Sequence, residues 1–375
     1  MRRAEIIGAG IAGLTAAAAL GRRGWAVRVH ERAPEIRAAG SGIYIWENGL
    51  RVLEAIGAHD EAVAGAHRGA IRETRNQRNQ ITAVHRFDPK THGRVVSIVR
   101  QRLMDALRHA AIAAGAEIVF NAQGIRARPD GRVEFSDGSA AQADLVVAAD
   151  GVNSKLRDSL GLLRRRKSLG DGAARLLIPR LAEERTGADG QKYVEYWSGT
   201  RRLLYTPCDA DTVYLALTSL NGDAAARLSP LPVETWIASF PFLETLLRRI
   251  AGPARWDDFE VVNLSRWSAG RVAIIGDAAC AQAPNLGQGG GCALMGALSL
   301  AATLETEDVL PGLAAWEARE RPLYEHTQRF SSFLSSLTWW PNALRSAFFA
   351  IAGRSAWFSE RRWRAARHRP FGSGG

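Results

Sequence analysis

The 375-residue sequence predicts an α/β protein that combines a mainly parallel sheet, an inserted antiparallel sheet and a helical C-terminal region. Three observations support this prediction. A glycine-rich turn joins an apolar strand to a helix near the start of the chain. Two more apolar strands, at 144–149 and 271–275, each end beside a glycine and an aspartate. Between these two strands, residues 170–220 hold four strand-like runs separated by turn residues.

The first predicted unit is a strand that ends at Ile7 and a helix at Leu14–Leu20. The turn between them has the pattern G-x-G-x-x-G, formed by Gly8, Gly10 and Gly13. The first glycine permits a tight turn, the second lets a pyrophosphate approach the backbone, and the third lets the helix pack against the strand. The amides at the start of the helix suit the same pyrophosphate.

A second strand at 25–30 leads directly to Glu31. This acid lies about twenty residues beyond the glycines, where a Rossmann-like unit places the acceptor for a ribose 2′-hydroxyl. The sequence therefore predicts dinucleotide binding. The spacing alone leaves FAD and NAD(P) as alternatives.

The next expected elements alternate between strands and helices. In order, they are a strand at 42–46, a helix at 47–57, polar strands within 70–98 with a loop at 88–89, a helix at 100–114, a strand at 116–120 and a hairpin around 133–138. The strand that ends in Asp150-Gly151 is expected to return to the first sheet, and a helix begins at Lys155. After the antiparallel strands, residues 232–250 are expected to be mainly helical.

The third landmark is the strand 271–275, which leads to Gly276 and Asp277. A proline- and glycine-rich turn at 284–291 follows, and then a helix at 292–304. A glycine cluster before a helix exposes backbone amides to an anion or to the polar edge of a ring.

The composition limits the possible functions. The net charge is +11, but most of the basic residues are scattered arginines, so we favour a pocket for an anionic ligand over nucleic acid or a membrane as the reason for it. The first strand begins within four residues, which leaves no room for a signal peptide. The cysteines have no metal-binding or redox spacing, and we expect no metal site and a cytoplasmic location. They are Cys208, Cys280 and Cys292.

Taken together, the three motifs resemble the fingerprints of the single-component (group A) FAD-dependent aromatic-ring monooxygenases. The resemblance keeps their order and spacing over nearly the whole chain. It implies a Rossmann-like FAD-binding domain of the GR2 type with an inserted antiparallel substrate domain. The implied division is 1–70, 98–165 and 266–325 for FAD, 71–97 and 166–265 for the substrate sheet, and 326–375 for the C-terminal helical region.

The resemblance also implies which residues bind tightly held, non-covalent FAD. Glu31 would bind the ribose, Arg100 the pyrophosphate and ribityl region, Asp277 the ribityl hydroxyls, and the 284–290 turn the flavin ring. The full expected set is Gly8, Gly10, Ile11, Ala12, Gly13, Glu31, Arg32, Arg100, Asp150, Gly276, Asp277, Pro284, Gly287, Gln288, Gly289 and Gly290.

The chemistry of the family implies NAD(P)H as a transient co-substrate and O2 as the oxidant. The expected product is a hydroxylated small anionic aromatic or N-heteroaromatic ring, formed through a flavin C4a-hydroperoxide, with decarboxylation or ring opening also possible in the family. Two alternatives remain at this stage. One is a flavin oxidoreductase that inserts no oxygen, and the other is a flavin- or ligand-binding protein without catalysis.

Within the family, four segments are most similar to the 2-methyl-3-hydroxypyridine-5-carboxylic acid oxygenase subgroup. They are 42–46, 48–54, 204–208 and 240–244. This likeness implies substrate-site roles for Arg175, Arg202 and Tyr214, with an arginine fork for a carboxylate. Arg72 would replace a tyrosine and add a cation, and Pro284 would face the flavin. Cys280 and Gly296 stand where the family has a histidine and an acid.

The C-terminal tail is basic and rich in aromatic residues. A helix of this composition can lie on a membrane or bind a partner. We favour a helix that covers the FAD domain or forms a dimer contact, and therefore a monomer or homodimer with no membrane partner. The aromatic residues are Trp339, Trp340, Phe348, Phe349, Trp357, Phe358 and Trp363.

Overall fold

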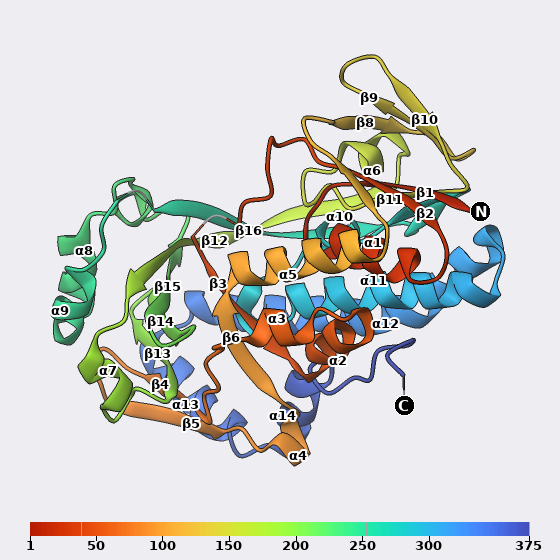
Figure 1. The fold of residues 1–375 in the computed structure, drawn as a ribbon. Coiled ribbons are helices and arrows are strands. Elements are labelled where there is room, and N and C mark those ends of the chain that lie inside the picture. The colour runs from red at the N-terminus through yellow and green to blue at the C-terminus, as the bar shows by residue number, and fades with distance from the viewer. Residues whose placement is uncertain (39, 253, 375) are drawn as a thin grey trace.

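The computed structural model describes residues 1–38, 40–252 and 254–374, and Figure 1 shows its fold. A six-stranded sheet lies at one end, in the order β17-β18-β11-β1-β2-β7. The strands are β1 (Arg3–Ile7), β2 (Ala26–His30), β7 (Glu117–Val119), β11 (Leu145–Ala148), β17 (Ser268–Ala269) and β18 (Val272–Ile274). All neighbours are parallel except β17 and β18.

The strand order confirms that β11, the strand expected before Asp150-Gly151, belongs to the same sheet as β1. β11 lies between β1 and β18, so the three strands that precede the glycine and aspartate motifs are adjacent. Because they are parallel, their carboxyl ends share one edge of the sheet. A ligand bound at this edge can contact all three motifs.

Helices pack tightly beside this sheet. α1 (Ile11–Gly21) is buried along almost its whole length and contacts α5 (Arg100–Ala113) and α11 (Gly289–Thr306). The many alanines of α1 permit this close packing on several sides. α12 (Val309–Ser336) packs on the far side of α11, and α2 (Glu47–Ile56) and α3 (His59–Val63) lie nearby.

A second, seven-stranded sheet has the order β16-β12-β15-β14-β13-β4-β5. The strands are β4 (Ile71–Arg75), β5 (Ile81–Arg86), β12 (Leu163–Pro179), β13 (Lys192–Ser198), β14 (Arg201–Pro207), β15 (Thr212–Leu220) and β16 (Arg255–Leu264). The expected antiparallel arrangement is found at every pair except β4 and β13, which are parallel. These two strands are far apart in the sequence, so no hairpin fixes their relative direction.

Three local predictions were wrong. No strand was predicted at β16, whose first half is polar, yet it pairs with β12. β12 begins at Leu163 and includes the basic run that follows, which the sequence indicated only as a charge cluster. The loop expected at 88–89 is the start of α4 (Pro89–His92), because Asp88 caps it by accepting a hydrogen bond from the amide of Lys90 at 3.0 Å.

The remaining elements complete the chain. They are β3 (Gly42–Trp46) paired with β6 (Val95–Val99), the three-stranded sheet β8 (Gly124–Ala127), β9 (Arg132–Phe135) and β10 (Ala140–Gln142), and the short helices α6 (Lys155–Ser159), α7 (Ala182–Thr186), α8 (Val233–Ser239), α9 (Glu244–Leu247) and α10 (Asp277–Cys280). Four 3₁₀ turns are η1 (Ala224–Arg227), η2 (Pro241–Leu243), η3 (Pro284–Leu286) and η4 (Leu337–Trp339).

The C-terminal tail forms two helices, α13 (Asn342–Ala352) and α14 (Ala356–Trp363). The ring of Trp363 lies 5.0 Å from that of Trp46 and 4.7 Å from that of His85. The amide of Asn48 donates to the carbonyl of Ala366 at 3.1 Å. The tail is therefore packed onto the body of the protein. None of the helices in the described ranges has both the length and the apolar character needed to cross a membrane.

Candidate cofactor and substrate site

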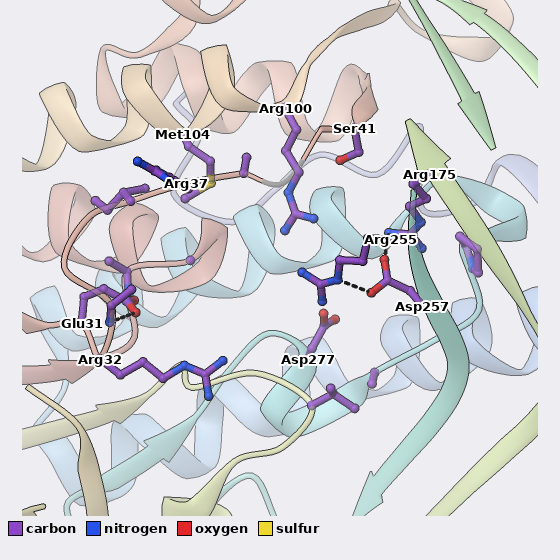
Figure 2. A pocket seen from close by; sticks show the side chains of 18 of the residues that line it. Glu31, Arg32, Arg37, Ser41, Arg100, Met104, Arg175, Arg255, Asp257 and Asp277 are labelled. Atoms are coloured by element: carbon purple, nitrogen blue, oxygen red, sulfur yellow. Dashed lines mark hydrogen bonds and ion pairs between the residues drawn. The ribbon is translucent and has the colours of Figure 1, made fainter. Parts of the chain in front are cut away.

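A cavity of about 630 Å³ lies at the carboxyl edge of the six-stranded sheet. The turn after β1 lines it, as do Glu31 after β2, Arg100 at the start of α5, and Asp277 and Pro284 after β18. Figure 2 shows Arg100 and Asp277 reaching toward each other from opposite sides of this cavity. The three predicted motifs therefore converge on one space.

The glycine turn leaves room for a ligand at its middle position. Gly8 has a φ of +104°, and a Cβ atom there would lie 2.5 Å from the carbonyl oxygen of Ala149. A Cβ atom at Gly13 would overlap the carbonyl of Gly8. At Gly10, by contrast, a Cβ atom would meet nothing within 4 Å. Gly8 and Gly13 are thus required by the fold, whereas Gly10 keeps open the space that a pyrophosphate would fill.

Glu31 both shapes the turn and faces the cavity. One carboxylate oxygen accepts a hydrogen bond from the amide of Ala9 at 2.8 Å, and the other accepts from the amide of Ala33 at 2.9 Å. Each oxygen keeps a second lone pair for a hydroxyl group. Arg32 also lines the cavity.

Arg100 and Asp277 are the charged pair in the middle of the cavity. The Nε atom of Arg100 is buried and has no hydrogen-bond partner among the described residues. Burial, and then the nearby Arg175, lower the pKa of Arg100. Burial raises the pKa of Asp277, and the charges of Arg100 and Arg175 offset only part of this effect. A guanidinium without a partner opposite a desolvated carboxylate fits a ligand that has both phosphates and hydroxyl groups, as FAD does.

Asp150, expected to support the pyrophosphate region, lies beside the glycine turn, where a Cβ atom at Gly8 would be 3.2 Å from its Cα atom. In the turn that follows β11, Val152 lines the cavity, whereas Asp150 does not. Its carboxylate accepts hydrogen bonds from the hydroxyl of Ser154 and the amide of Leu156. Arg157 is fully buried and donates to the carbonyls of Val152 and Ala278, at 3.0 and 3.4 Å. Ser154 and Arg157 connect the second motif to the third through these hydrogen bonds. They were not assigned this role from the sequence, although their regular spacing after Asp150-Gly151 was a signal for it.

The turn between α10 and α11 carries the groups expected to face a flavin ring. Pro284 lines the cavity, and Gly287 has a φ of +63°. Gln288 is the N-cap of α11, which begins at Gly289, so the first amides of this long helix lie in the turn. The side chain of Asn48 fixes the side chain of Gln288 by donating to its amide oxygen Oε1 at 2.9 Å.

Trp46 supports this turn from β3. Its Nε1 atom donates to the carbonyl of Gly287 at 3.1 Å, and its ring is buried. We expect Trp46→Phe to lower the free energy of unfolding by about 1–3 kcal/mol, because the carbonyl loses its partner and the ring is smaller. Thermal and urea unfolding measure this loss. Trp25→Phe is the matched control, since Trp25 is equally buried but its Nε1 atom has no partner; an equal loss there would contradict the assigned role of the hydrogen bond.

The register of the seven-stranded sheet separates its two faces. The side chains of directly paired residues point to the same side of a sheet. Arg202 pairs with Thr218 and Thr206 pairs with Tyr214, so these four side chains lie on one face. One face carries the polar set Arg72, Arg175, Glu195, Arg202, Thr206, Tyr214, Thr218 and Asp257. The other face carries apolar residues such as Val194, Leu203 and Leu215, which form a core with α8 and α9.

The arginines on the polar face are already paired with acids. Arg72 Nη2 lies 2.6 Å from one oxygen of Glu195, and Arg202 Nη1 lies 3.2 Å from the other. Arg175 lines the cavity and lies 3.7 Å from Asp257. The expected fork of Arg175 and Arg202 is thus not left open: Glu195 joins Arg202 to Arg72, and Asp257 lies beside Arg175. Glu195 was missed because only the strand pairing shows which side chains face these arginines.

Tyr44 was also missed as a site residue. It lies on β3 beside Gly287, and its hydroxyl is 2.6 Å from that of Thr206. Tyr214 is buried on β15, where it pairs with Thr206 of β14 and lies on the same face of the sheet. Tyr44 therefore lies between the turn expected to face the flavin and the polar sheet face, to which Tyr214 belongs. Cys280 is buried, and burial raises its pKa well above the usual value, which favours packing over thiol reactivity.

Comparison with known proteins agrees with this geometry. The family model described as the FAD binding domain matches residues 3–315. A 2-heptyl-3-hydroxy-4(1H)-quinolone synthase of Mycobacteroides abscessus is 44% identical over 94% of this chain and 95% of its own length. AqdB1 of Rhodococcus erythropolis, whose name assigns the same activity provisionally, is 48% identical over 98% of this chain and 97% of its own. The solved tetrameric form of 2-methyl-3-hydroxypyridine-5-carboxylic acid oxygenase is 38% identical, with a TM-score of 0.88 and coverage of 99% and 97%.

The fold and the site define a Rossmann-type FAD-binding enzyme with a second, mainly antiparallel sheet. The chain belongs to the FAD-binding domain family and, within it, to the FAD-dependent aromatic-ring monooxygenases. The family assignment made from the three motifs is confirmed.

Proposed function

We propose that this protein is a monooxygenase that uses FAD, NAD(P)H and O2 to hydroxylate a 2-alkyl-4(1H)-quinolone at the ring carbon between the carbonyl and the alkyl-bearing carbon. Two relatives support a quinolone as the substrate, because they are named as quinolone synthases and match nearly the whole chain at 44% and 48% identity. The solved pyridine oxygenase supports an N-heteroaromatic substrate more generally.

One structural observation carries the choice of ring. Of the two arginines expected to hold a substrate carboxylate, Arg202 is bridged to Arg72 by Glu195, and Arg175 lies 3.7 Å from Asp257. The polar face also carries hydroxyl groups close to Arg202, including those of Tyr214 and Thr206. Hydroxyl groups suit the carbonyl and N–H of a quinolone, which has no carboxylate. We therefore replace the expected anionic ring by an uncharged one.

The residues of the cavity would hold the cofactor in an extended pose. Glu31 would accept from the ribose, Gly10 would admit the pyrophosphate, and Arg100 and Asp277 would bind the phosphate and ribityl groups. The first amides of α11 would stabilise negative charge at the edge of the ring. When bound, FAD supplies the reducing equivalents and activates O2.

The sheet residues would orient the substrate and exclude water. Tyr44 and Tyr214 would hold the quinolone against the turn at Pro284, and the covered polar face would keep bulk water away from the reacting carbon. The reaction balances as quinolone, NAD(P)H, O2 and a proton giving the hydroxyquinolone, NAD(P)⁺ and water. No side chain is required as a nucleophile.

Product analysis tests this proposal. The purified holoenzyme is incubated in air with NADH or NADPH and 2-heptyl-4(1H)-quinolone, and the expected product is one oxygen atom heavier. Rapid substrate-dependent oxidation of NAD(P)H without such a product would instead favour an oxidoreductase that inserts no oxygen. Flavin that NAD(P)H cannot reduce would favour a binding protein.

We also propose the domain division expected from the sequence, and a monomer or homodimer. The related pyridine oxygenase has been solved in a tetrameric form, so a tetramer is the competing state. Light scattering on the purified holoenzyme distinguishes a mass of 40.7 kDa, or twice that value, from four times that value.

A further inference from the structure

We propose that Glu195 occupies the position of a substrate carboxylate between Arg72 and Arg202, and thereby makes this site select rings that have no carboxylate. The inference rests on the proposed function and specifies its substrate class. It assigns a specificity-determining role to a residue that no sequence motif singled out.

The geometry is that of a bridging carboxylate. Glu195 lies on β13, between β4 with Arg72 and β14 with Arg202. Each of its two oxygens meets one guanidinium group, at 2.6 and 3.2 Å. A ligand carboxylate held between two arginines would make the same pair of contacts. Glu195 therefore uses the donors that such a ligand would need.

The bridge is buried and charged. The side chain of Glu195 is 5% exposed and that of Arg202 is 10% exposed. Burial acts to raise the pKa of Glu195, but the charges of Arg72, Arg202 and Arg362, with the hydrogen bond from Arg72, hold this pKa below the usual value. The carboxylate is thus ionised at neutral pH. Glu195, Arg72 and Arg202 together therefore carry one net positive charge, whereas the two arginines without Glu195 would carry two.

The groups beside the bridge include uncharged donors and acceptors, and the guanidinium groups of Arg345 and Arg362 add positive charge near Glu195. Arg202 Nη2 also donates to the hydroxyl of Thr218 at 3.3 Å. Next along the sheet are Thr206 and Tyr214, and Tyr44 shares a hydrogen bond with Thr206. A ring with a carbonyl and an N–H finds partners here without competing for Glu195. A ring with a carboxylate would have to displace Glu195 or remain next to it, and either is unfavourable.

The test compares two ligands that differ in one group. They are 2-methyl-4(1H)-quinolone and 4-oxo-1,4-dihydroquinoline-2-carboxylate, titrated into the wild-type holoenzyme and into Glu195→Gln, with Kd read from the absorption of bound flavin. The wild type should favour the uncharged ring. Glu195→Gln keeps the shape but frees the charge of both arginines, and should shift the ratio of the two Kd values by about tenfold or more toward the carboxylate.

Glu73→Gln is the matched control. Glu73 lies on β4 next to Arg72 in sequence but on the opposite face of the sheet. Its side chain is also 5% exposed and forms ion pairs, with Arg75 and with Lys192. Its replacement should leave the ratio of Kd values unchanged. A similar shift in Glu73→Gln would show that loss of any buried acid alters binding, and would overturn the assignment.

A second variant tests the bridge without a substrate. Glu195→Ala leaves a hole between the two arginines, which acetate should fill and acetamide should not. Acetate should therefore raise the melting temperature of Glu195→Ala above that of the same variant in acetamide, with no such difference in the wild type. If Glu195→Gln does not fold, this variant, refolded in either additive, replaces it. Equal effects of both additives would contradict the proposal.

The outcomes separate the inference from the function on which it rests. If the wild type makes the hydroxyquinolone but Glu195→Gln retains FAD and the wild-type ratio of Kd values, the role of Glu195 is wrong and the function stands. If the wild type makes no oxygenated product while acetate still stabilises Glu195→Ala, the function is wrong and the carboxylate bridge stands.

Discussion

Replacing Gly10 with valine should give a folded protein that no longer binds FAD. A Cβ atom at Gly10 meets no atom within 4 Å, so the apoprotein has room for the side chain. The same side chain would fill the space through which a pyrophosphate reaches the backbone amides of the turn. We expect the affinity for FAD to fall by about 100-fold or more, since the phosphate contacts of the turn would be lost. The measurements are flavin absorbance per protein and the melting temperature of the apoprotein.

Gly8→Val is the control for the Gly10 variant. Gly8 has a positive φ, and its Cβ atom would lie 2.5 Å from the carbonyl of Ala149 on the neighbouring strand segment. This variant should lose stability as well as FAD. The account of the turn would be wrong if Gly10→Val retained FAD at the wild-type level, or if it unfolded as readily as Gly8→Val.

Asp277→Asn should weaken FAD binding while stabilising the apoprotein. Burial raises the pKa of Asp277, so the ionised carboxylate costs folding free energy at neutral pH. That cost is absent at pH values low enough to protonate the group in the folded protein, and it appears as the pH rises through its raised pKa. The melting temperature of the apoprotein should therefore be higher in Asp277→Asn at pH 7–8, and the difference should shrink as the pH falls.

The effect of Asp277→Asn on the cofactor should have the opposite sign. A charged acceptor for ribityl hydroxyls contributes about 1.5–3 kcal/mol per hydrogen bond, so we expect FAD to bind about 10- to 100-fold more weakly. Isothermal titration of the apoprotein with FAD measures this change. Stronger FAD binding, or a lower melting temperature of the apoprotein at pH 8, would show that Asp277 has a structural role instead.

The cofactor region could be predicted from the sequence because its signals are local. Gly8, Gly10 and Gly13 perform their roles within one turn, and Glu31 follows the next strand at a fixed spacing. The parallel strands before Asp150 and Asp277 carry continuous apolar runs, which identify buried strands without knowledge of their partners. Arg100 was found through the family resemblance, and the structure places it at the cavity opposite Asp277.

The substrate region could be predicted only in part, because its geometry depends on pairing between distant strands. Arg72 and Arg202 were both predicted to belong to the substrate region, but nothing near either residue in the sequence indicates that Glu195 lies between them. The parallel pairing of β4 with β13, which are joined by no short connection, creates this contact. A register shifted by one residue would turn Glu195 to the opposite face. The polar first half of β16 was missed for a related reason, since its pairing with β12, rather than its hydropathy, makes it a strand.

If the proposed function is right, this enzyme transfers an oxygen atom from O2 to an N-heteroaromatic ring. The most direct test is to incubate the reduced holoenzyme with 2-heptyl-4(1H)-quinolone under ¹⁸O2 and to determine the mass of the product. We expect a hydroxyquinolone that carries one ¹⁸O atom, formed with little release of hydrogen peroxide. An unlabelled product, or hydrogen peroxide formed in amounts equal to the NAD(P)H consumed, would contradict it.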